Sequence, residues 1–108
     1  MTTAEPRRGE LWIAQLDKRR PVVILTRDPM AQLLNAVIIG PITSTIRGLS
    51  TEVPVGPNDG IRVDSVVNLD SVQLLDRRLL RRKVGQLGTA RMAEICKSVS
   101  IAIGCDLS

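Results

Sequence analysis

Short stretches in which hydrophobic and polar residues alternate, or in which apolar β-branched residues run together, recur along the chain and predict β-strands. Residues 10–16 partly alternate around Trp12, and residues 22–26 form a compact run typical of a strand buried on both faces. The polar turn between them ends in Pro21, which suits the first residue of a strand, so the two segments predict a hairpin. Further strands are predicted at residues 36–40, 51–55, 65–69, 72–75 and 84–87.

Two segments carry helical signals. Residues 28–34 predict a short helical turn, because Pro29 stands where the first helical residue would be. Near the end of the chain, apolar residues recur at three- and four-residue steps: Met92, Ile95, Cys96, Val99, Ala102 and Ile103. This spacing predicts an amphipathic helix over residues 90–103, with Thr89 as its N-cap and Gly104 after its end.

A chain of 108 residues has room for one small domain with one hydrophobic core. Several short strands with one closing helix predict an α+β, β-rich fold: a small, strongly bent sheet or barrel packed by the C-terminal helix. Residues 1–8 are polar and interrupted by Pro6, which predicts a flexible leader, and residues 9–108 are expected to form the single domain. The leader has no apolar signal segment and the longest apolar runs are too short to span a membrane, so we expect a cytoplasmic protein with no membrane association.

Charge adds a candidate ligand class to this picture. The chain carries 15 Lys and Arg against 11 Asp and Glu, a formal net charge of +4, which favours a polyanionic partner. Twelve of these cations are Arg, whose planar group can grip a phosphate through two hydrogen bonds. Trp12 is the only aromatic residue, which excludes a platform of several stacking rings and leaves Trp12 as core filler or as a single stacking ring.

Missing residue types exclude several kinds of chemistry. Without His or Tyr, the chain cannot use histidine acid–base catalysis, a histidine metal site or a Ser-His-Asp triad. Cys96 and Cys105 are nine positions apart without His partners, which does not make a zinc site, and no role is assigned to them. Asp64 and Asp70 are too widely separated along one strand face to hold a hard cation by themselves. We therefore expect no metal site and no cofactor.

The turn before Pro21 is the first candidate for phosphate binding. Lys18, Arg19 and Arg20 enter the buried strand there, so that strand would fix the position of Arg20 better than a free loop would. The alternative is a solvated charged hairpin, because runs of charge are usually surface features.

A polar loop predicted at residues 41–48 is the second candidate. Its hydroxyl residues Thr43, Ser44 and Thr45 stand close to Arg47, and together they could donate several hydrogen bonds to phosphate oxygens. Ordinary turn chemistry explains the same residues equally well.

The densest basic run consists of Arg77, Arg78, Arg81, Arg82 and Lys83. It could be a stripe that follows an RNA backbone. A solvated connector anchored by Leu79 and Leu80 is the alternative.

Five segments in a fixed order, the last of them in two parts, carry a resemblance to a known family. They are residues 8–12 (RGELW), 20–24 (RPVVI), 40–47 (GPITSTIR), 51–55 (TEVPV), and 64–67 (DSVV) with 75–79 (LDRRL). With these segments the chain resembles the MazF/PemK family of toxin endoribonucleases from about Arg8 to Gly104.

The resemblance implies an SH3-like β-barrel with a C-terminal helix, a homodimer, and metal-independent cleavage of single-stranded RNA at short sequence motifs. It puts Arg20 and Thr43 where the family keeps its catalytic pair. The expected RNA-binding residues are Lys18, Arg19, Ser44, Thr45, Arg47, Gln73 and Arg77. The expected inhibitor is an antitoxin with an acidic, disordered tail that folds across the same basic groove.

In the implied reaction, the substrate's own 2′-hydroxyl attacks the adjacent phosphorus and leaves a 2′,3′-cyclic phosphate and a 5′-hydroxyl. Arg20 would neutralise the developing charge, and Thr43 would hold a non-bridging oxygen. The enzyme supplies no nucleophile, and no residue of the sequence identifies the general base. Such a toxin inhibits translation and growth.

The chain departs from the family pattern in two places. Asp17 is followed almost at once by Arg20, where many members insert a Gly-rich stretch that helps to cover the RNA. Ser71 and Gln73 stand where many members carry Gln and then a basic residue, so a base preference does not transfer.

Two other functions fit parts of the sequence. A CcdB-type toxin shares the barrel and binds DNA gyrase without cutting RNA, but it depends on an aromatic C-terminal tail, whereas this chain ends GCDLS. A non-catalytic barrel would bind RNA electrostatically, with steep salt dependence and no cleavage. The pairing of Arg20 with Thr43 distinguishes the nuclease from both.

Overall fold

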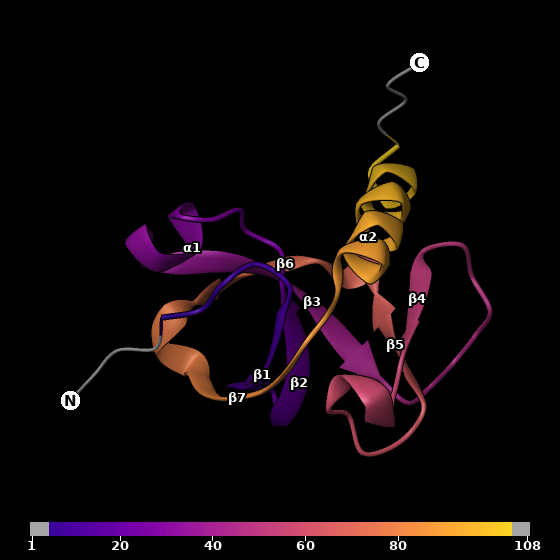
Figure 1. The fold of residues 1–108 in the computed structure, drawn as a ribbon, viewed down its shortest axis with the longest axis horizontal. Helices are drawn as coiled ribbons and strands as arrows, with labels where there is room; N and C mark the ends of the chain where they lie inside the picture. The colour runs from indigo at the N-terminus through magenta and orange to yellow at the C-terminus, as the bar shows by residue number, and fades with distance from the viewer. Residues whose placement is uncertain (1–4, 105–108) are drawn as a thin grey trace.

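Seven antiparallel strands form one continuous sheet in this computed structural model, which describes residues 5–104 (Figure 1). They are β1 (Glu10–Gln15), β2 (Arg19–Ile24), β3 (Ala36–Thr43), β4 (Glu52–Val55), β5 (Ser65–Asn68), β6 (Gln73–Asp76) and β7 (Leu80–Gln86). The order along the sheet is β4-β5-β3-β2-β1-β7, and β6 also pairs with β3. Because β4 and β7 end this path without pairing to each other, the sheet is bent and barrel-like but not closed.

Helices and single turns complete the described part of the chain. They are α1 (Met30–Leu33), α2 (Thr89–Ala102), and the 3₁₀ turns η1 (Pro57–Asp59), η2 (Leu69–Ser71) and η3 (Arg77–Leu79). The expected β-rich α+β fold with a C-terminal helix is therefore confirmed.

Strand β2 is buried on both faces, as its β-branched run predicts. Val23 belongs to an apolar cluster that includes Ile95 of α2, whereas Val22 belongs to a second cluster on the other side that includes Ile39 and Leu75. Burying an aliphatic side chain of this size stabilises the fold by roughly 1.5–3 kcal/mol. The two clusters hold β2 in place and with it the turn that precedes it.

Strand β3 is longer than its apolar pattern predicts, and this changes the setting of the second candidate segment. The expected strand ended at Gly40, but β3 continues through Pro41 to Thr43. It does so by changing partner: Pro41 lies opposite Val22 of β2, and Thr43 lies opposite Val66 of β5. Thr43 is therefore on a strand end and not in a free loop.

Strand β7 also begins earlier than expected, at Leu80 and not at Val84. The last three residues of the basic run, Arg81, Arg82 and Lys83, consequently lie on a strand and are exposed. Because β7 stands at the edge of the sheet, its charged side chains can reach water without disturbing the core.

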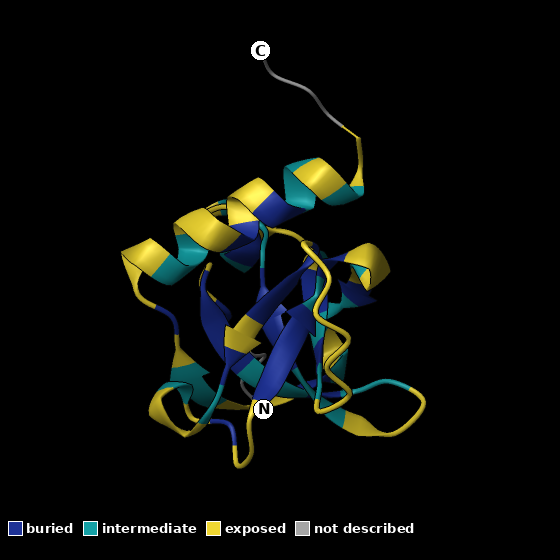
Figure 2. Cartoon of the chain, turned by 90° about the vertical axis from the view of Figure 1, so that its right-hand side faces the viewer, coloured by how far each residue is buried: buried dark blue, intermediate teal, exposed yellow. Residues whose placement is uncertain are grey.

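Helix α2 packs over the sheet through a narrow apolar face. Ile95 and Ser98 are its buried residues, and Figure 2 shows the helix lying over buried strands with an exposed outer surface. The helix occupies nearly the predicted range, and Gly104 follows it with a positive φ of 70°. The predicted N-cap is wrong: Gly88 occupies that position without a side-chain hydrogen bond, and Thr89 is the first helical residue.

Residues 5–8, at the end of the expected leader, pack against the domain. Pro6 is buried and its carbonyl accepts a hydrogen bond from Gln32, while the backbone N–H of Arg8 donates to Asp28 at 3.1 Å. The partners lie at least 20 residues further along the chain, so the local sequence gave no sign of these contacts.

The turn between β4 and β5 packs against β7 at two glycines, Gly60 and Gly85. Gly60 has a φ of +98°, and a Cβ atom on Gly85 would lie 1.9 Å from the carbonyl oxygen of Asp59. No side chain can occupy that space, so only glycine lets the two backbones approach. The contact brings Arg62, just after this turn, to the same side of the molecule as the basic residues of β7.

Candidate nucleic-acid interface

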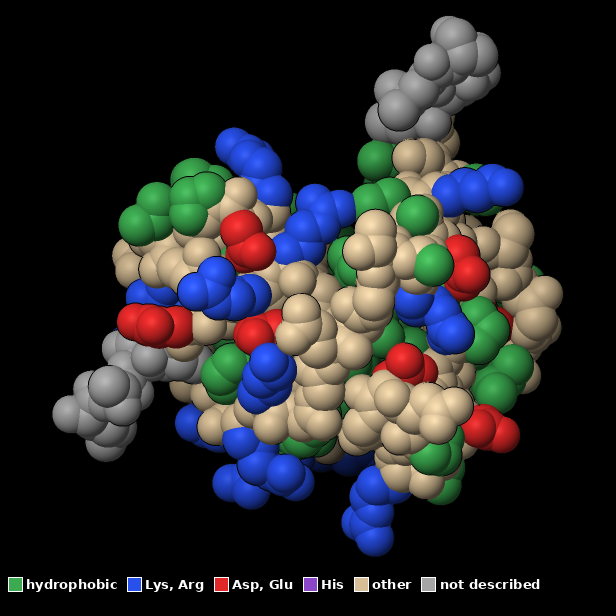
Figure 3. All heavy atoms as spheres, in the orientation of Figure 1, with side chains coloured by type: hydrophobic (Ala, Val, Ile, Leu, Met, Phe, Trp, Pro, Cys, Tyr) green, Lys and Arg blue, Asp and Glu red, His purple; other side chains and the backbone are tan. Residues whose placement is uncertain are grey.

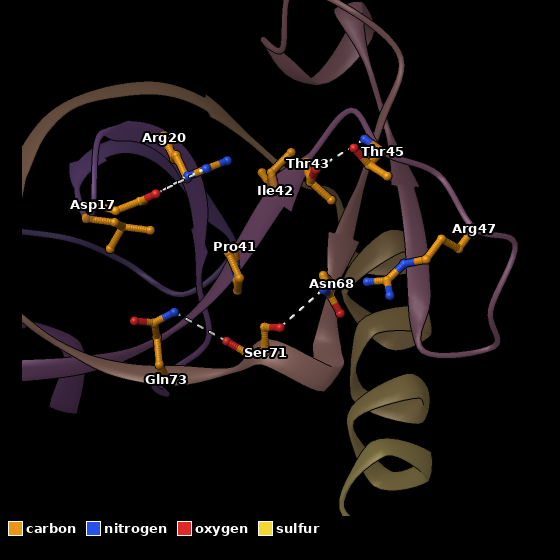
Figure 4. Close-up of a pocket in the computed structure, with 11 residues that line it drawn as sticks. Asp17, Arg20, Pro41, Ile42, Thr43, Thr45, Arg47, Asn68, Ser71 and Gln73 are labelled. Carbon is orange, nitrogen blue, oxygen red and sulfur yellow. Dashed lines mark hydrogen bonds and ion pairs between the residues drawn. The ribbon is translucent and has the colours of Figure 1, made fainter.

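Strand register brings Arg20 and Thr43 together. In the β2–β3 pairing, Val22 lies opposite Pro41 and Val23 opposite Gly40. Continuing this register by two residues puts Arg20 opposite Thr43, beyond the point where β3 leaves β2 for β5. The two side chains line the same hollow, with Ile42 between them (Figure 4).

Arg20 is held by Asp17, the middle residue of the turn between β1 and β2. Its Nε donates to Asp17 Oδ1 at 3.0 Å and its Nη2 donates to Asp17 Oδ2 at 3.3 Å. The hydrogen bonds from Arg20 lower the pKa of Asp17, and Asp17 raises the pKa of Arg20, so both groups are charged at neutral pH. An arginine has five N–H donors, so this pairing leaves the Nη1 edge of Arg20 available to a ligand.

Thr43 presents a hydroxyl group that is oriented by the backbone two residues further along. Its Oγ1 accepts a hydrogen bond from the backbone N–H of Thr45 at 3.1 Å. The hydroxyl proton is not used by this bond and can be donated to an acceptor in the hollow.

The hollow that contains both side chains, called the first hollow here, has a volume of about 420 Å³. It is lined by Leu16, Asp17, Arg20, Pro41, Ile42, Thr43, Thr45, Arg47, Asn68, Ser71 and Gln73. Figure 4 shows Arg20 and Thr43 along one side of it, and Asn68, Ser71 and Gln73 along the other. Its volume lies within the range of roughly 300–1,000 Å³ that is usual for small-ligand pockets.

A buried carboxylate organises the loop beside this hollow. Glu52 Oε1 accepts hydrogen bonds from the backbone N–H groups of Arg47, Gly48 and Leu49 at 3.0, 2.8 and 3.2 Å. Arg47 Nε lies 3.6 Å from Glu52 Oε2, and the Glu52 side chain is only 2% exposed. Burial opposes ionisation of Glu52, but the three N–H groups and Arg47 outweigh it, so the pKa of Glu52 lies below its usual value.

A second hollow, of about 840 Å³, adjoins the first and shares Arg20, Ile42, Thr43 and Thr45 with it. Its lining includes six cations, namely Lys18, Arg19, Arg20, Arg62, Arg82 and Lys83, and none of its described lining residues is acidic. Among these six cations, Lys83 is paired with a buried acid: its Nζ lies 3.0 Å from Oε2 of Glu10. Figure 3 shows Lys and Arg side chains gathered without acidic ones along the lower left edge of the molecule, where β1, β2 and β7 lie in Figure 1.

Most of the residues predicted to form the site lie around these two hollows. Lys18, Arg19 and Ser44 line the second, Arg47 and Gln73 line the first, and Thr45 lines both. Arg77 does not: it lies at the other end of β6, where it donates to the carbonyl of Gln32. The basic run is thus divided, because Arg82 and Lys83 join the second hollow while Arg77 and Arg78 lie apart from it.

Several lining residues were not predicted as part of the site. Asp17 could have been predicted from its position three residues before Arg20, because a turn of that length lets a carboxylate reach the guanidinium group. Asn68 lines the first hollow because β5 pairs with β3, and Arg62 lines the second because the turn before it packs on β7. No local sequence pattern predicts either of these long-range contacts. Glu52 lies beside the first hollow without lining it, and it is buried although Pro54, two residues further along the same strand, is exposed, so the strand pattern did not predict its burial.

Three other side chains were considered from the sequence, namely Trp12, Cys96 and Cys105. Trp12 is half-buried, packs against the second apolar cluster, and donates from its indole N–H to Glu10 at 3.0 Å, so its contacts are those of a residue packed at the edge of the core. Cys96 is exposed and accepts a hydrogen bond from Arg8, whereas Cys105 lies outside the described residues. Within residues 5–104, no three His, Cys, Asp or Glu side chains come together as they would in a metal site.

A bent sheet with a C-terminal helix and two adjoining hollows, one of them lined by six cations, defines a small β-rich domain with a cationic surface. The chain belongs to the family of PemK-like, MazF-like toxins of type II toxin–antitoxin systems, whose pattern matches residues 7–103.

Relatives with similar sequences carry endoribonuclease names. The chain is 42% identical over 106 residues to a probable endoribonuclease MazF5 of Mycobacterium tuberculosis, covering 95% of this chain and 97% of that one. It is 42% identical over 94 residues to endoribonuclease MazF3 of the same species, covering 87% and 91% of the two chains.

Solved structures agree with the fold. The toxin MazF-mt6 of Mycobacterium tuberculosis superposes with a TM-score of 0.87 at 40% identity, covering 90% of this chain and 98% of that one. A mycobacterial endoribonuclease solved in complex with its cognate antitoxin superposes with a TM-score of 0.85 at 25% identity, covering 95% and 99% of the chains. No helix among residues 5–104 has the length and apolar character needed to cross a membrane.

Proposed function

We propose that this chain is a sequence-specific endoribonuclease that cuts single-stranded RNA without a metal ion. The 2′-oxygen of one nucleotide attacks the adjacent phosphorus and forms a new P–O bond, while the bond from phosphorus to the 5′-oxygen breaks. The 2′-hydroxyl loses a proton, and the leaving 5′-oxygen gains one. The products are a 2′,3′-cyclic phosphate and a 5′-hydroxyl. The observation that carries this proposal is the convergence of Arg20 and Thr43 in one hollow.

Arg20 and Thr43 are proposed as the catalytic pair. The Nη1 edge of Arg20 binds a non-bridging oxygen and offsets the negative charge that grows on phosphorus, while the Thr43 hydroxyl donates to the other non-bridging oxygen. Since Asp17 raises the pKa of Arg20, the guanidinium group stays protonated and acts through its charge and its hydrogen bonds. Positive charge at the phosphate is the contribution that a metal ion makes in other nucleases.

Charge supports RNA as the ligand. The second hollow presents its cations without an opposing carboxylate in its described lining, and the first hollow adds neutral polar groups. Lys18, Arg19, Ser44, Thr45, Arg47 and Gln73 are proposed to contact the RNA. Arg77 is proposed to contact RNA only outside these hollows, where a longer RNA would pass the end of β6.

The family supports a biological role. We propose that the chain is the toxin of a toxin–antitoxin pair, acts as a homodimer and inhibits translation and growth by cutting RNA. An antitoxin with an acidic, disordered tail would fold across the cationic second hollow and exclude RNA. Residues 9–108 are proposed as the toxin domain.

The test is cleavage of a long RNA by purified protein and by the variants Arg20→Ala and Thr43→Ala. Each variant is expected to lose cleavage by a factor of about 100 or more, because removal of one donor to a developing oxyanion typically costs about that much. Arg78→Ala and Thr89→Ala are matched controls, since both residues are exposed and lie outside the two hollows. The proposal fails if folded Arg20→Ala and Thr43→Ala cut as fast as these controls.

A further inference from the structure

We infer that the first hollow is a base-reading subsite, in which Asn68, Ser71 and Gln73 recognise the base of one nucleotide next to the cut. The inference rests on the proposed ribonuclease function and adds to it which residues determine the cleavage sequence. It starts from a chemical difference between the two hollows, which meet at Arg20 and Thr43.

The second hollow has the chemistry of a phosphate-binding surface. Phosphate oxygens only accept hydrogen bonds, and Lys and Arg only donate them. Within the described residues, Lys18, Arg19, Arg62 and Arg82 form no ion pairs, so their charges are open to a ligand. Contacts of this kind hold a nucleic acid in position without reading its sequence.

The wall of the first hollow formed by β5, η2 and β6 has different chemistry. Asn68, Ser71 and Gln73 are all neutral, and together they present both donors and acceptors. The edges of nucleobases also carry both donors and acceptors, and sequence-specific proteins read single-stranded RNA through these edges. A phosphate would leave the acceptors of this wall without a partner.

The Asn68 amide is fixed in one orientation. Its Oδ1 accepts a hydrogen bond from the backbone N–H of Asp70 at 3.1 Å, and its Nδ2 donates to Ser71 Oγ at 3.2 Å. A backbone N–H can only donate, so the amide oxygen must face Asp70. One Asn68 N–H and the Ser71 hydroxyl proton therefore remain as donors that face a ligand.

Gln73 adds the acceptor. It is exposed, and the single hydrogen bond that its side chain makes within the described residues is a long one of 3.5 Å from Nε2 to the Ser71 carbonyl. Its Oε1 is free to accept from a base amino or imino group. The fixed donors of Asn68 and Ser71 and the adaptable acceptor of Gln73 form a pattern that some bases match and others do not.

Five other lining residues determine where the base lies. Leu16, Pro41 and Ile42 provide apolar surface on which a flat base can rest in the absence of an aromatic ring. Arg20 and Thr43 stand at the boundary with the second hollow, so a phosphate held by them is directly attached to the nucleotide whose base enters the first hollow. The subsite therefore reads a position that adjoins the cut.

The experiment uses the full-length protein and a pool of RNA with a randomised central segment, with cut sites determined by sequencing. Ser71→Ala and Gln73→Ala are compared with the wild-type protein and with Ser100→Ala, a serine of α2 that lines neither hollow. The expected result is a loss of about tenfold in base discrimination at one position adjoining the cut, with preferences elsewhere unchanged. Arg82→Gln, in the second hollow, should instead lower cleavage of all sequences evenly and reduce its salt dependence.

Two results would overturn the inference while leaving the ribonuclease function intact. One is that both Ser71→Ala and Gln73→Ala cut the same motifs with the same relative rates as the wild-type protein. The other is that Arg82→Gln, and not these variants, changes the base preference. If the wild-type protein cuts no RNA, the proposed function itself fails, and the two failures are thus distinguishable.

Discussion

Replacing the buried carboxylate of Glu52 by the neutral, isosteric amide in Glu52→Gln should destabilise the loop that carries Thr45 and Arg47. The wild-type carboxylate oxygen accepts from three consecutive backbone N–H groups, at 3.0, 2.8 and 3.2 Å. Glutamine can still place an oxygen there, but without the charge, and its amide group would face Arg47 in place of the second carboxylate oxygen.

The size of the effect follows from these contacts. A hydrogen bond to a charged group contributes about 1 kcal/mol more than a neutral one. Three bonds share one oxygen and the removed charge was buried, so their sum is smaller than three separate bonds, and we expect a loss of about 2 kcal/mol in the free energy of unfolding. In a domain of this size that lowers Tm by roughly 10 °C.

Urea unfolding followed by Trp12 fluorescence measures this loss, because Trp12 is the only aromatic residue of the chain. The folded pKa of Glu52 lies below its ordinary value of 4.5, so its charge stabilises the protein fully above that pH. The stabilisation is lost as the pH falls through the lower, folded-state pKa. The difference between Glu52→Gln and wild type should therefore shrink in acid.

Two results would refute this reasoning. Equal stability of the two proteins at neutral pH would mean that the carboxylate does not stabilise the loop. A difference that stays constant into acid would mean that packing, and not charge, is responsible. As a functional readout, Glu52→Gln should also bind RNA more weakly, since Thr45 and Arg47 line the first hollow.

Two further substitutions test other parts of the site. Asp17→Asn should lower the single-turnover cleavage rate at saturating RNA more than it weakens RNA binding. The reason is that Arg20 loses the charged partner at 3.0 Å that orients it, while the site also loses a negative charge. Equal cleavage rates for Asp17→Asn and the wild-type protein would contradict this positioning role. Gly85→Ala should lower the free energy of unfolding by about 3 kcal/mol, since the new Cβ would lie 1.9 Å from the Asp59 carbonyl oxygen. The control Gly88→Ala, with no atom within 4 Å of the new Cβ, should lower it by less than about 1 kcal/mol. Similar losses for the two variants would show that the turn between β4 and β5 moves freely.

Local patterns predicted the elements well where one residue run decides the outcome. The β-branched run of β2 and the three- and four-residue spacing of α2 both specify burial directly. Helix α2 forms within one residue of the predicted range at each end, whereas β2 runs over Arg19–Ile24 and so begins inside the predicted polar turn. The ends of β3 and β7 were missed because they depend on partners distant in sequence. Thr43 is on a strand only because Val66 pairs with it.

The candidate site could be predicted only in part for the same reason. Arg20 and Thr43 were found from the resemblance, and the structure brings them together through the β2–β3 register. Arg77, chosen from the same resemblance, lies elsewhere because β6 runs away from the hollow toward α1. Asn68 and Arg62 carry no distinguishing neighbours in sequence, and only the folded sheet shows where they lie.

The most direct test of the central claim is incubation of the purified protein with a long natural RNA in excess EDTA, beside Arg20→Ala, followed by mapping of cut sites and labelling of fragment ends. We predict discrete cuts at a recurring short sequence, with 5′-hydroxyl and 2′,3′-cyclic phosphate ends, and no cuts by Arg20→Ala. Intact RNA after incubation with an excess of folded wild-type protein, or fragments with 5′-phosphate ends, would contradict the account.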